Sequence, residues 1–252
     1  LTESVADLLH GQVLSRDELV SELVQDKRFK GMEEQLRSGW GALLKPLAWQ
    51  GALCYGPSPS SKATFTHPAS LLKNWNGLPD PAEAAPAVIK RYLSAYGPAT
   101  PETFDAWLSR NSNKKSTLRS WFASLGEQIV EVRVEGETRY LLAEHEDELA
   151  ATRPSRATHL LGAFDQFVLG PGTKDTHMLA HEHRPLVSKA AGWIAPVLTQ
   201  GGRITGVWEM DDGNLVVTPF PGEQAPPSQV LEDAAARLTA VHGSVKVTPR
   251  VD

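Results

Sequence analysis

Residues 84–143 decide the fold; they read AAPAVIKRYLSAYGPATPETFDAWLSRNSNKKSTLRSWFASLGEQIVEVRVEGETRYLLA. Apolar residues recur in the first two thirds at the three- and four-residue spacing of amphipathic helices, and the last third contains two runs typical of strands. The spacing predicts three short helices followed by a β-hairpin. That order is typical of a winged helix, so we expect such a module from Ala84 to Ala143.

Local signals give the ends of these elements. The first helix starts at Pro81 or Pro86 and stops at Gly97-Pro98, and Thr100 caps the second helix with Pro101 at its first position. The third helix follows a turn at residues 111–113. Its predicted core face is an apolar stripe formed by Leu118, Trp121, Phe122 and Leu125. The predicted strands are Gln128–Val134 and Thr138–Ala143, joined at Glu135-Gly136.

The chain before this module repeats the same order less clearly. A helix over Leu1–Leu9, a helix capped by Ser15 and a helical stretch over Met32–Trp49 precede two strand-like runs. The runs, Ala52–Tyr55 and Ala63–Thr66, flank a tip rich in Gly, Pro and Ser. We therefore expect a second winged helix in residues 1–76, followed by the first-described module in residues 77–150.

Residues 151–252 change to the two-residue period of strands. Strands are expected at His159–Leu169, Trp193–Thr199, Ile204–Met210, Leu215–Thr218 and Ser244–Val247, and one amphipathic helix capped by Ser228. This predicts a β-rich domain with one packed helix, for which a partial barrel is one arrangement. The fold class is α+β, with tandem winged-helix modules before the β-rich domain.

Composition limits the function. The 252 residues are 41% hydrophobic and 22% charged, as in ordinary globular proteins, and the formal net charge of −5 argues against a strongly basic polyanion binder. The single cysteine, Cys54, excludes an internal disulfide and favours a buried structural thiol. No apolar run reaches the ~18 residues that span a bilayer and the start lacks the basic flank of a signal peptide, which predicts a cytoplasmic protein without membrane contact.

A local basic face lies on the third helix of the middle module, the usual reading element of a winged helix. The cations are Arg110, Lys114, Lys115 and Arg119, with no acid between them, and Ser116 and Ser120 lie with Asn113 on the predicted solvent side. Lysines at the start of the helix can reach phosphates, and small side chains allow close approach to a groove. We expect contact with duplex DNA; the alternative is an ordinary solvated helix face.

Two other groups are candidates for chemistry. His177, His181 and His183 lie close in sequence, but without recognised ligand spacing we favour structural or surface roles, and we expect neither a metal nor a cofactor. Asp165 interrupts an apolar run that is predicted to be a strand. It is a weak catalytic candidate, and a structural, hydrogen-bonded carboxylate is the favoured alternative.

Several motifs resemble the AlkZ/YcaQ-like DNA glycosylase family in their order and spacing. They are Arg91–Trp107, the run LLGAFDQFVLG at residues 160–170 that contains Asp165, the pair His183-Arg184, and Gly202–Trp208. The resemblance implies a C-shaped array of winged helices with a β-rich C-terminal domain. It also implies excision of bulky or crosslinked alkylated purines, including the unhooking of interstrand crosslinks.

The same resemblance assigns catalysis to a Gln-aliphatic-Gln or Gln-aliphatic-Asp element in the family's first winged helix. None of the glutamines here has Gln or Asp two residues later, and the sequence starts at Leu1 without methionine. We expect that the catalytic module either precedes Leu1 or is lacking, so that this chain alone is inactive. The alternative is a winged-helix transcriptional regulator or protein-interaction scaffold.

Overall fold

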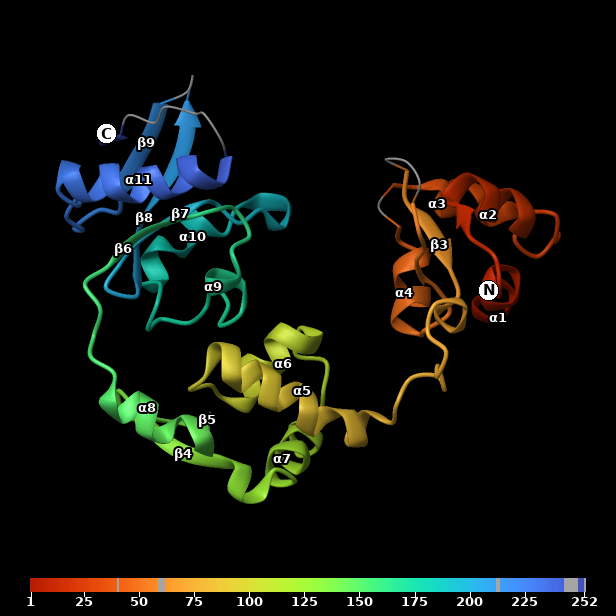
Figure 1. Ribbon diagram of the computed structural model, residues 1–252, viewed down its shortest axis with the longest axis horizontal. Coiled ribbons are helices and arrows are strands. Elements are labelled where there is room, and N and C mark those ends of the chain that lie inside the picture. The colour runs from red at the N-terminus through yellow and green to blue at the C-terminus, as the bar shows by residue number, and fades with distance from the viewer. Residues whose placement is uncertain (40, 59–61, 212–213, 243–248, 252) are drawn as a thin grey trace. The chain divides into compact units, whose positions relative to one another are not determined.

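The computed structural model describes residues 1–39, 41–58, 62–211, 214–242 and 249–251. The chain forms two compact units, Leu1–Pro81 and Ala82–Asp252, each with its own hydrophobic core (Figure 1). The predicted modules at 77–150 and 151–252 lie together in the second unit, apart from the first few residues of the former. Within the described ranges, no helix has the length and apolar character needed to cross a bilayer.

The first unit has the element order of a winged helix. Its helices and strands are α1 (Thr2–Leu9), β1 (Leu14–Ser15), α2 (Arg16–Leu23), α3 (Glu33–Arg37), α4 (Leu44–Trp49), β2 (Cys54–Tyr55) and β3 (Thr64–Thr66). β3 lies between β1 and β2 and is antiparallel to both, with Leu14 opposite Phe65 and Cys54 opposite Thr66. Ser15 and Glu18 form a capping box that starts α2, as the sequence predicted for Ser15.

The expected continuous helix over Met32–Trp49 is wrong. A 3₁₀ helix at Lys30–Met32 leads into α3, which ends at Arg37, and α4 begins only at Leu44. Gly41 has a left-handed backbone (φ 62°), a conformation that glycine adopts without strain and that interrupts a right-handed helix. The predicted wing tip extends over residues 59–61, which lie outside the described residues.

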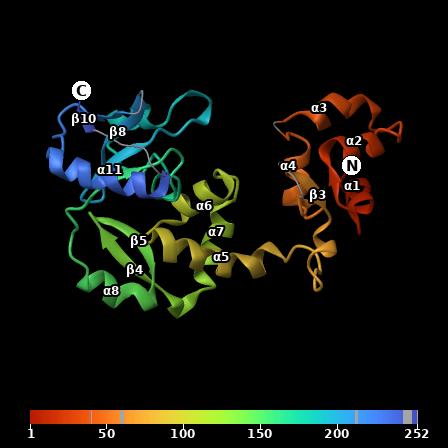
Figure 2. The same ribbon diagram turned by 45° about the horizontal axis from the view of Figure 1, so that its top comes forward.

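The middle of the chain confirms the predicted three helices and hairpin. These are α5 (Pro81–Tyr96), α6 (Pro101–Ser109), α7 (Lys115–Ala123), β4 (Ile129–Val134) and β5 (Glu137–Leu142), and Figure 2 shows the two strands as an antiparallel pair. Thr100 caps α6 as expected. A bridge between Ala99 and Tyr140 supplies the third strand contact of a winged-helix sheet. The core is aromatic, with Phe104 edge-on to both Tyr92 and Phe122.

A five-stranded sheet forms most of the C-terminal part. After α8 (Glu146–Ala151), the order across the sheet is β10 (Pro249–Val251), β9 (Asn214–Pro219), β8 (Arg203–Asp211), β7 (Val197–Gln200) and β6 (Thr158–Leu161). α11 (Ser228–His242) packs on one face through Leu231 (Figures 1 and 2). An irregular layer with α9 (Gln166–Leu169) and α10 (Arg184–Val187) covers the other face. The described strands end in two edges, β10 and β6, and do not close into a barrel.

Two predicted strands are shorter than expected. β6 ends at Leu161. The positive φ of Phe164 (58°) then turns the chain, and Asp165 becomes the N-cap of α9. β7 begins only at Val197, after Pro196, whose ring nitrogen has no hydrogen to donate to a neighbouring strand. The predicted strand Ser244–Val247 lies outside the described residues.

Contacts of α5 with α9 and with Gly170 at its end join the winged helix to the C-terminal part of the unit. The Tyr92 hydroxyl donates to the Gly170 carbonyl oxygen (3.2 Å), and the Tyr96 hydroxyl donates to the Gln166 side chain (3.2 Å). A Cβ atom on Gly170 would stand 2.1 Å from the Tyr96 ring. Glycine is therefore required where the two parts of the unit meet.

Candidate nucleic-acid interface

The turn between α6 and α7 is fixed by a buried carboxylate. Asp105 is 2% exposed, and its Oδ1 accepts hydrogen bonds from the Ser109 hydroxyl (2.5 Å) and the Asn113 side-chain amide (2.7 Å). Arg110 and Asn111 both have positive φ, at 58° and 64°, so the chain reverses sharply after α6. The side-chain bonds hold α7 in one orientation relative to α6.

Asn113 is therefore misplaced in the sequence prediction. It precedes the helix, and its side chain points inward to Asp105 and Ser109 instead of lying on the solvent face. The prediction extends the helical period two residues too far, because α7 begins at Lys115.

α7 separates an apolar side from a basic side. Leu118 and Phe122 are 3% exposed and pack into the aromatic core, as the predicted stripe requires. The opposite side exposes Ser116 and Ser120, Lys115 and Arg119 are exposed on the flank beside them, and the helix contains no acidic residue. Lys114 is the N-cap without a side-chain cap, so the amide hydrogens of the first turn are available to an acceptor from outside the helix.

The charges on this face are not neutralised within the protein. Arg110, Lys114, Lys115 and Arg119 are exposed, and none forms an ion pair in the part of the chain that the structure describes. Arg119 borders a hollow of about 310 Å³ that Glu131 of β4 also lines, so its surroundings are less positive than those of Lys115. The six predicted DNA-contact residues thus lie on α7 or on the turn before it.

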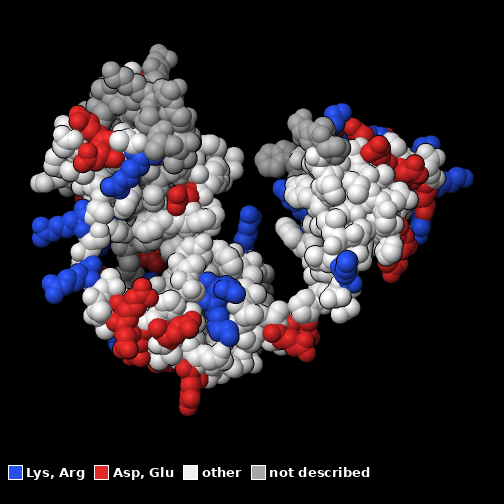
Figure 3. Space-filling model, in the orientation of Figure 1, with Lys and Arg blue, Asp and Glu red and all other residues white. Residues whose placement is uncertain are grey.

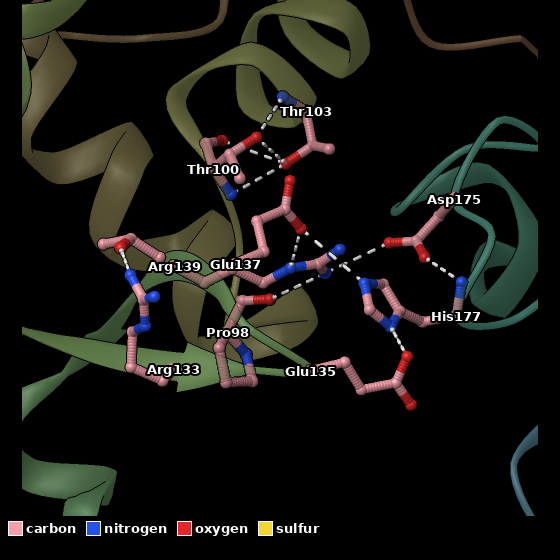
Figure 4. Close-up of polar contacts among 10 residues, drawn as sticks. Pro98, Thr100, Thr103, Arg133, Glu135, Glu137, Arg139, Asp175 and His177 are labelled. Atoms are coloured by element: carbon pink, nitrogen blue, oxygen red, sulfur yellow. Dashed lines mark hydrogen bonds and ion pairs between the residues drawn. The ribbon is translucent and has the colours of Figure 1, made fainter.

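Two carboxylates of the wing of this module contact the segment before α10. β4 and β5 are joined by Glu135 and Gly136, both with positive φ, as in a type I′ turn. Glu135 Oε2 lies 2.9 Å from His177 Nδ1, and Glu137 Oε2 lies 2.9 Å from Arg139 Nε and 3.6 Å from His177 Nε2 (Figure 4). Both wing carboxylates therefore contact His177, in the segment before α10.

Arg139 and Asp175 form the buried centre of this network (Figure 4). Arg139 Nη1 lies 3.2 Å from Asp175 Oδ2, and the two side chains are 11% and 4% exposed. Asp175 Oδ1 also accepts from the backbone amide of His177 at 2.9 Å. Burial opposes the charge of the guanidinium, but its hydrogen bonds and attraction to Glu137 and Asp175 outweigh this and raise the pKa of Arg139.

A groove of about 500 Å³ lies beside this network. Arg110 from the α6–α7 turn, Lys174, His177 and Arg184 line it, together with Glu102 and the paired Glu137, Arg139 and Asp175. Arg184 Nε donates to the Thr173 hydroxyl at 3.2 Å, which orients its side chain. The groove brings together two residues that the sequence singled out separately, Arg110 and Arg184.

The structure does not bring Asp165 or His183 into this groove. Asp165 Oδ1 accepts from the Phe167 amide at 2.8 Å and caps α9, and the His183 ring packs against Phe220 with centroids 4.5 Å apart. His181 lies in a 3₁₀ helix, and the described residues around these histidines include no cluster suited to a metal ion. Residues 175–180 contain neither helix nor strand, so no helix aligns His177 with His181.

Sequence reasoning missed Lys174 and the Arg139–Asp175 pair. The two charges are 36 residues apart, on a strand and in a turn, and no periodic pattern relates them. The one signal in the sequence was an arginine within a predicted strand. Burying such a charge without a partner is costly, so a partner had to be expected. The partner could be identified only from the fold.

Acidic side chains gather elsewhere on this unit. Figure 3 shows them over α8, whose first turn contains Glu146, Asp147 and Glu148. A DNA backbone would be repelled there. This acidic cluster lies on α8, whereas the exposed cations lie on α7 and the turn before it.

Comparison with known proteins identifies the family. The model of the family described as DNA glycosylase AlkZ-like matches residues 1–241. An interstrand DNA cross-link repair glycosylase of Streptomyces sahachiroi is 56% identical over 252 residues, which are the whole of this chain and 68% of that protein. The solved structure of the Streptomyces sahachiroi DNA glycosylase AlkZ, also 56% identical, superposes with a TM-score of 0.94 over 100% of this chain and 68% of that one. The chain therefore belongs to the AlkZ-like DNA glycosylase family.

Proposed function

We propose that this chain holds duplex DNA on α7 and the turn before it. We further propose that it does so as part of a glycosylase that excises bulky or crosslinked alkylated purines. One observation carries the proposal: the four cations of this face are exposed and have no ion-pair partner among the described residues. A protein with a formal net charge of −5 attracts phosphates only where such charge is concentrated locally.

The geometry of the face suits backbone contact. Lys114 and Lys115 lie where the helix N-terminus adds its own partial positive charge, which favours phosphate. Ser116 and Ser120 are small enough for the helix to approach a groove closely. Arg119 can bind either a phosphate or a base edge.

The test is the salt dependence of duplex binding. The double substitution Lys115→Gln with Arg119→Gln should weaken binding and lower the slope of log affinity against log salt by roughly 0.9 for each phosphate that the variant no longer binds. The control substitutes two exposed cations outside the winged helix, Lys189→Gln with Arg237→Gln. An unchanged slope for the α7 variant, or an equal decrease in the control, contradicts the assignment.

The substrate class follows from the relative that is named as an interstrand cross-link repair glycosylase. A purine alkylated on a ring nitrogen is already a cationic leaving group, so catalysis needs mainly a positioned water and a group that stabilises the oxocarbenium-like sugar. The Gln-aliphatic-Gln or Gln-aliphatic-Asp element that resemblance assigns to this role does not occur in the 252 residues. We therefore propose that the chain by itself binds DNA without releasing bases.

A base-release assay on methylated-purine duplex checks this second part. No release above the uncatalysed rate is expected from the chain of 252 residues. Release by this chain would contradict the proposal, and Asp165→Asn then shows whether Asp165 is responsible. Asparagine also caps helices well, so this substitution removes the charge and keeps the support of α9.

A further inference from the structure

The first unit contains a pocket of about 420 Å³, a size within the range of ~300–1,000 Å³ that is usual for small-ligand pockets. The start of α2, α4 and strands β2 and β3 surround it, with Leu44, Ala48, Leu53 and Phe65 among its walls. α4 directly precedes the two wing strands, which is the place of the reading helix in a winged helix. The pocket thus opens on the side of the module suited to nucleic acid.

Two aromatic side chains at this pocket are exposed to an unusual degree. Trp49 is 73% exposed and Tyr55 is 75% exposed. The Tyr55 ring stacks on the buried Phe65 with centroids 5.8 Å apart and planes inclined by 23°, so only its outer face is free. Large aromatic rings usually bury most of their surface, and a pair left open beside a cavity indicates a ligand with a flat apolar face.

Positive charge accompanies the aromatic rings. The Arg16 guanidinium lies 6.0 Å from the Phe65 ring centroid and donates to the Ser38 carbonyl oxygen, which holds it at the pocket. Lys45 is exposed and has no ion pair within the described ranges. None of the described residues lining the pocket is acidic. The ligand that fits is therefore aromatic and carries a negative charge beside its ring.

We propose that this pocket holds one unpaired nucleotide of a DNA strand, with its base against the exposed rings of Trp49 and Tyr55 and a flanking phosphate beside Lys45. Base stacking on aromatic side chains, with cations along the backbone, is how proteins bind single strands. In a duplex, neighbouring bases cover both faces of each base, so these rings can stack only on a base that has left the helix. The pocket and α7 belong to different units, so this proposal does not depend on the duplex interface.

The experiment compares two ten-nucleotide single strands with the same backbone, one of thymidines and one of abasic residues. The full chain should bind the base-bearing strand at least about fivefold more tightly, which is the low end for stacking one base. Trp49→Leu with Tyr55→Leu should abolish this preference, because leucine keeps apolar bulk without an aromatic face. Both replaced residues are mostly exposed, so the fold should be retained, which circular dichroism checks.

Matched controls separate this pocket from other causes. Trp193→Leu removes a 52% exposed aromatic ring from the second unit and should leave the preference intact. Lys45→Gln should lower the salt slope for both strands by roughly 0.7, whereas Lys27→Gln, beyond the far end of α2, should not. Equal affinity of the unaltered chain for the two strands overturns the proposal, as does an equal decrease in Trp193→Leu. The α7 variant should keep the base preference, so failure here and failure of the duplex interface are distinguishable.

Discussion

Asp105 illustrates how one buried residue can position a candidate interface that it does not itself form. It is 2% exposed, and its carboxylate accepts from Ser109 and Asn113 on the turn that leads to α7. A buried carboxylate is tolerated only where such donors satisfy it. If α7 holds DNA as proposed, the contribution of Asp105 is to orient the cations of α7.

Asp105→Ala should destabilise the protein by about 1–3 kcal/mol, because it leaves two side-chain donors without their acceptor. Urea unfolding followed by circular dichroism measures the change. Asp105→Asn keeps one acceptor oxygen and should cost less. If the alanine variant were as stable as the unaltered protein, the turn would have to be held by other contacts.

At the scale of elements, the β4–β5 wing serves the architecture of the second unit. Arg139 on β5 binds both Glu137 on the same strand and Asp175 in the turn before α10. Removing the arginine leaves a nearly buried Asp175 with only the His177 amide as a partner, whereas removing Asp175 leaves the arginine with Glu137. The two partners should therefore not contribute equally.

Arg139→Met should cost about 3–5 kcal/mol of folding free energy, the usual effect of leaving a buried charge unpaired. Asp175→Leu should cost less, and the double variant should cost less than the sum of the two single variants. A double-mutant cycle by chemical unfolding measures the coupling. Additive effects would show that the two side chains stabilise the unit independently.

Local signals in the sequence were enough for several elements. Ser15 and Thr100 bond to the third residue of the helix that follows, so the cap and its helix are encoded within four residues. The solvent face of α7 was also predictable, because helical spacing alone places Ser116 and Ser120 opposite Leu118. The early end of β6 at Leu161 was not, since the positive φ of Phe164 is uncommon for an aromatic residue.

The groove and the pocket could not be predicted in this way. Arg110 and Arg184 line the same groove only because the winged helix packs against the C-terminal part of the unit. The pocket around Trp49 depends on the break between α3 and α4, where the sequence pattern indicates one long helix. Both sites arise from contacts between segments that are far apart in sequence. The spacing of apolar residues within one helix or strand does not predict such contacts.

At the scale of the whole molecule, the two compact units are joined through an exposed stretch. Residues 71–80 contain neither helix nor strand, and all but Trp75 are largely exposed. Exposed connections of this kind are preferred sites of proteolysis. Lys73 is the one basic residue within this stretch.

Limited trypsin digestion should therefore cut first after Lys73, and mass spectrometry of the early fragments identifies the site. The larger fragment contains α7 and should retain the salt-dependent duplex binding of the whole chain. The preference for base-bearing single strands should be absent from it. Early cutting within α5–α7 instead would show that the second unit is the less stable one.

The contacts of the wing with the turn before α10, and those of α5 with α9, have a consequence for the rigidity of this unit. Because Arg139, Asp175, Tyr92 and Gly170 bind the winged helix to the sheet through largely buried groups, the two can shift little against each other. A duplex bound to α7 would then lie in one fixed orientation relative to the sheet. If α7 holds duplex DNA as proposed, nuclease footprints of this unit on unrelated sequences should therefore have the same length.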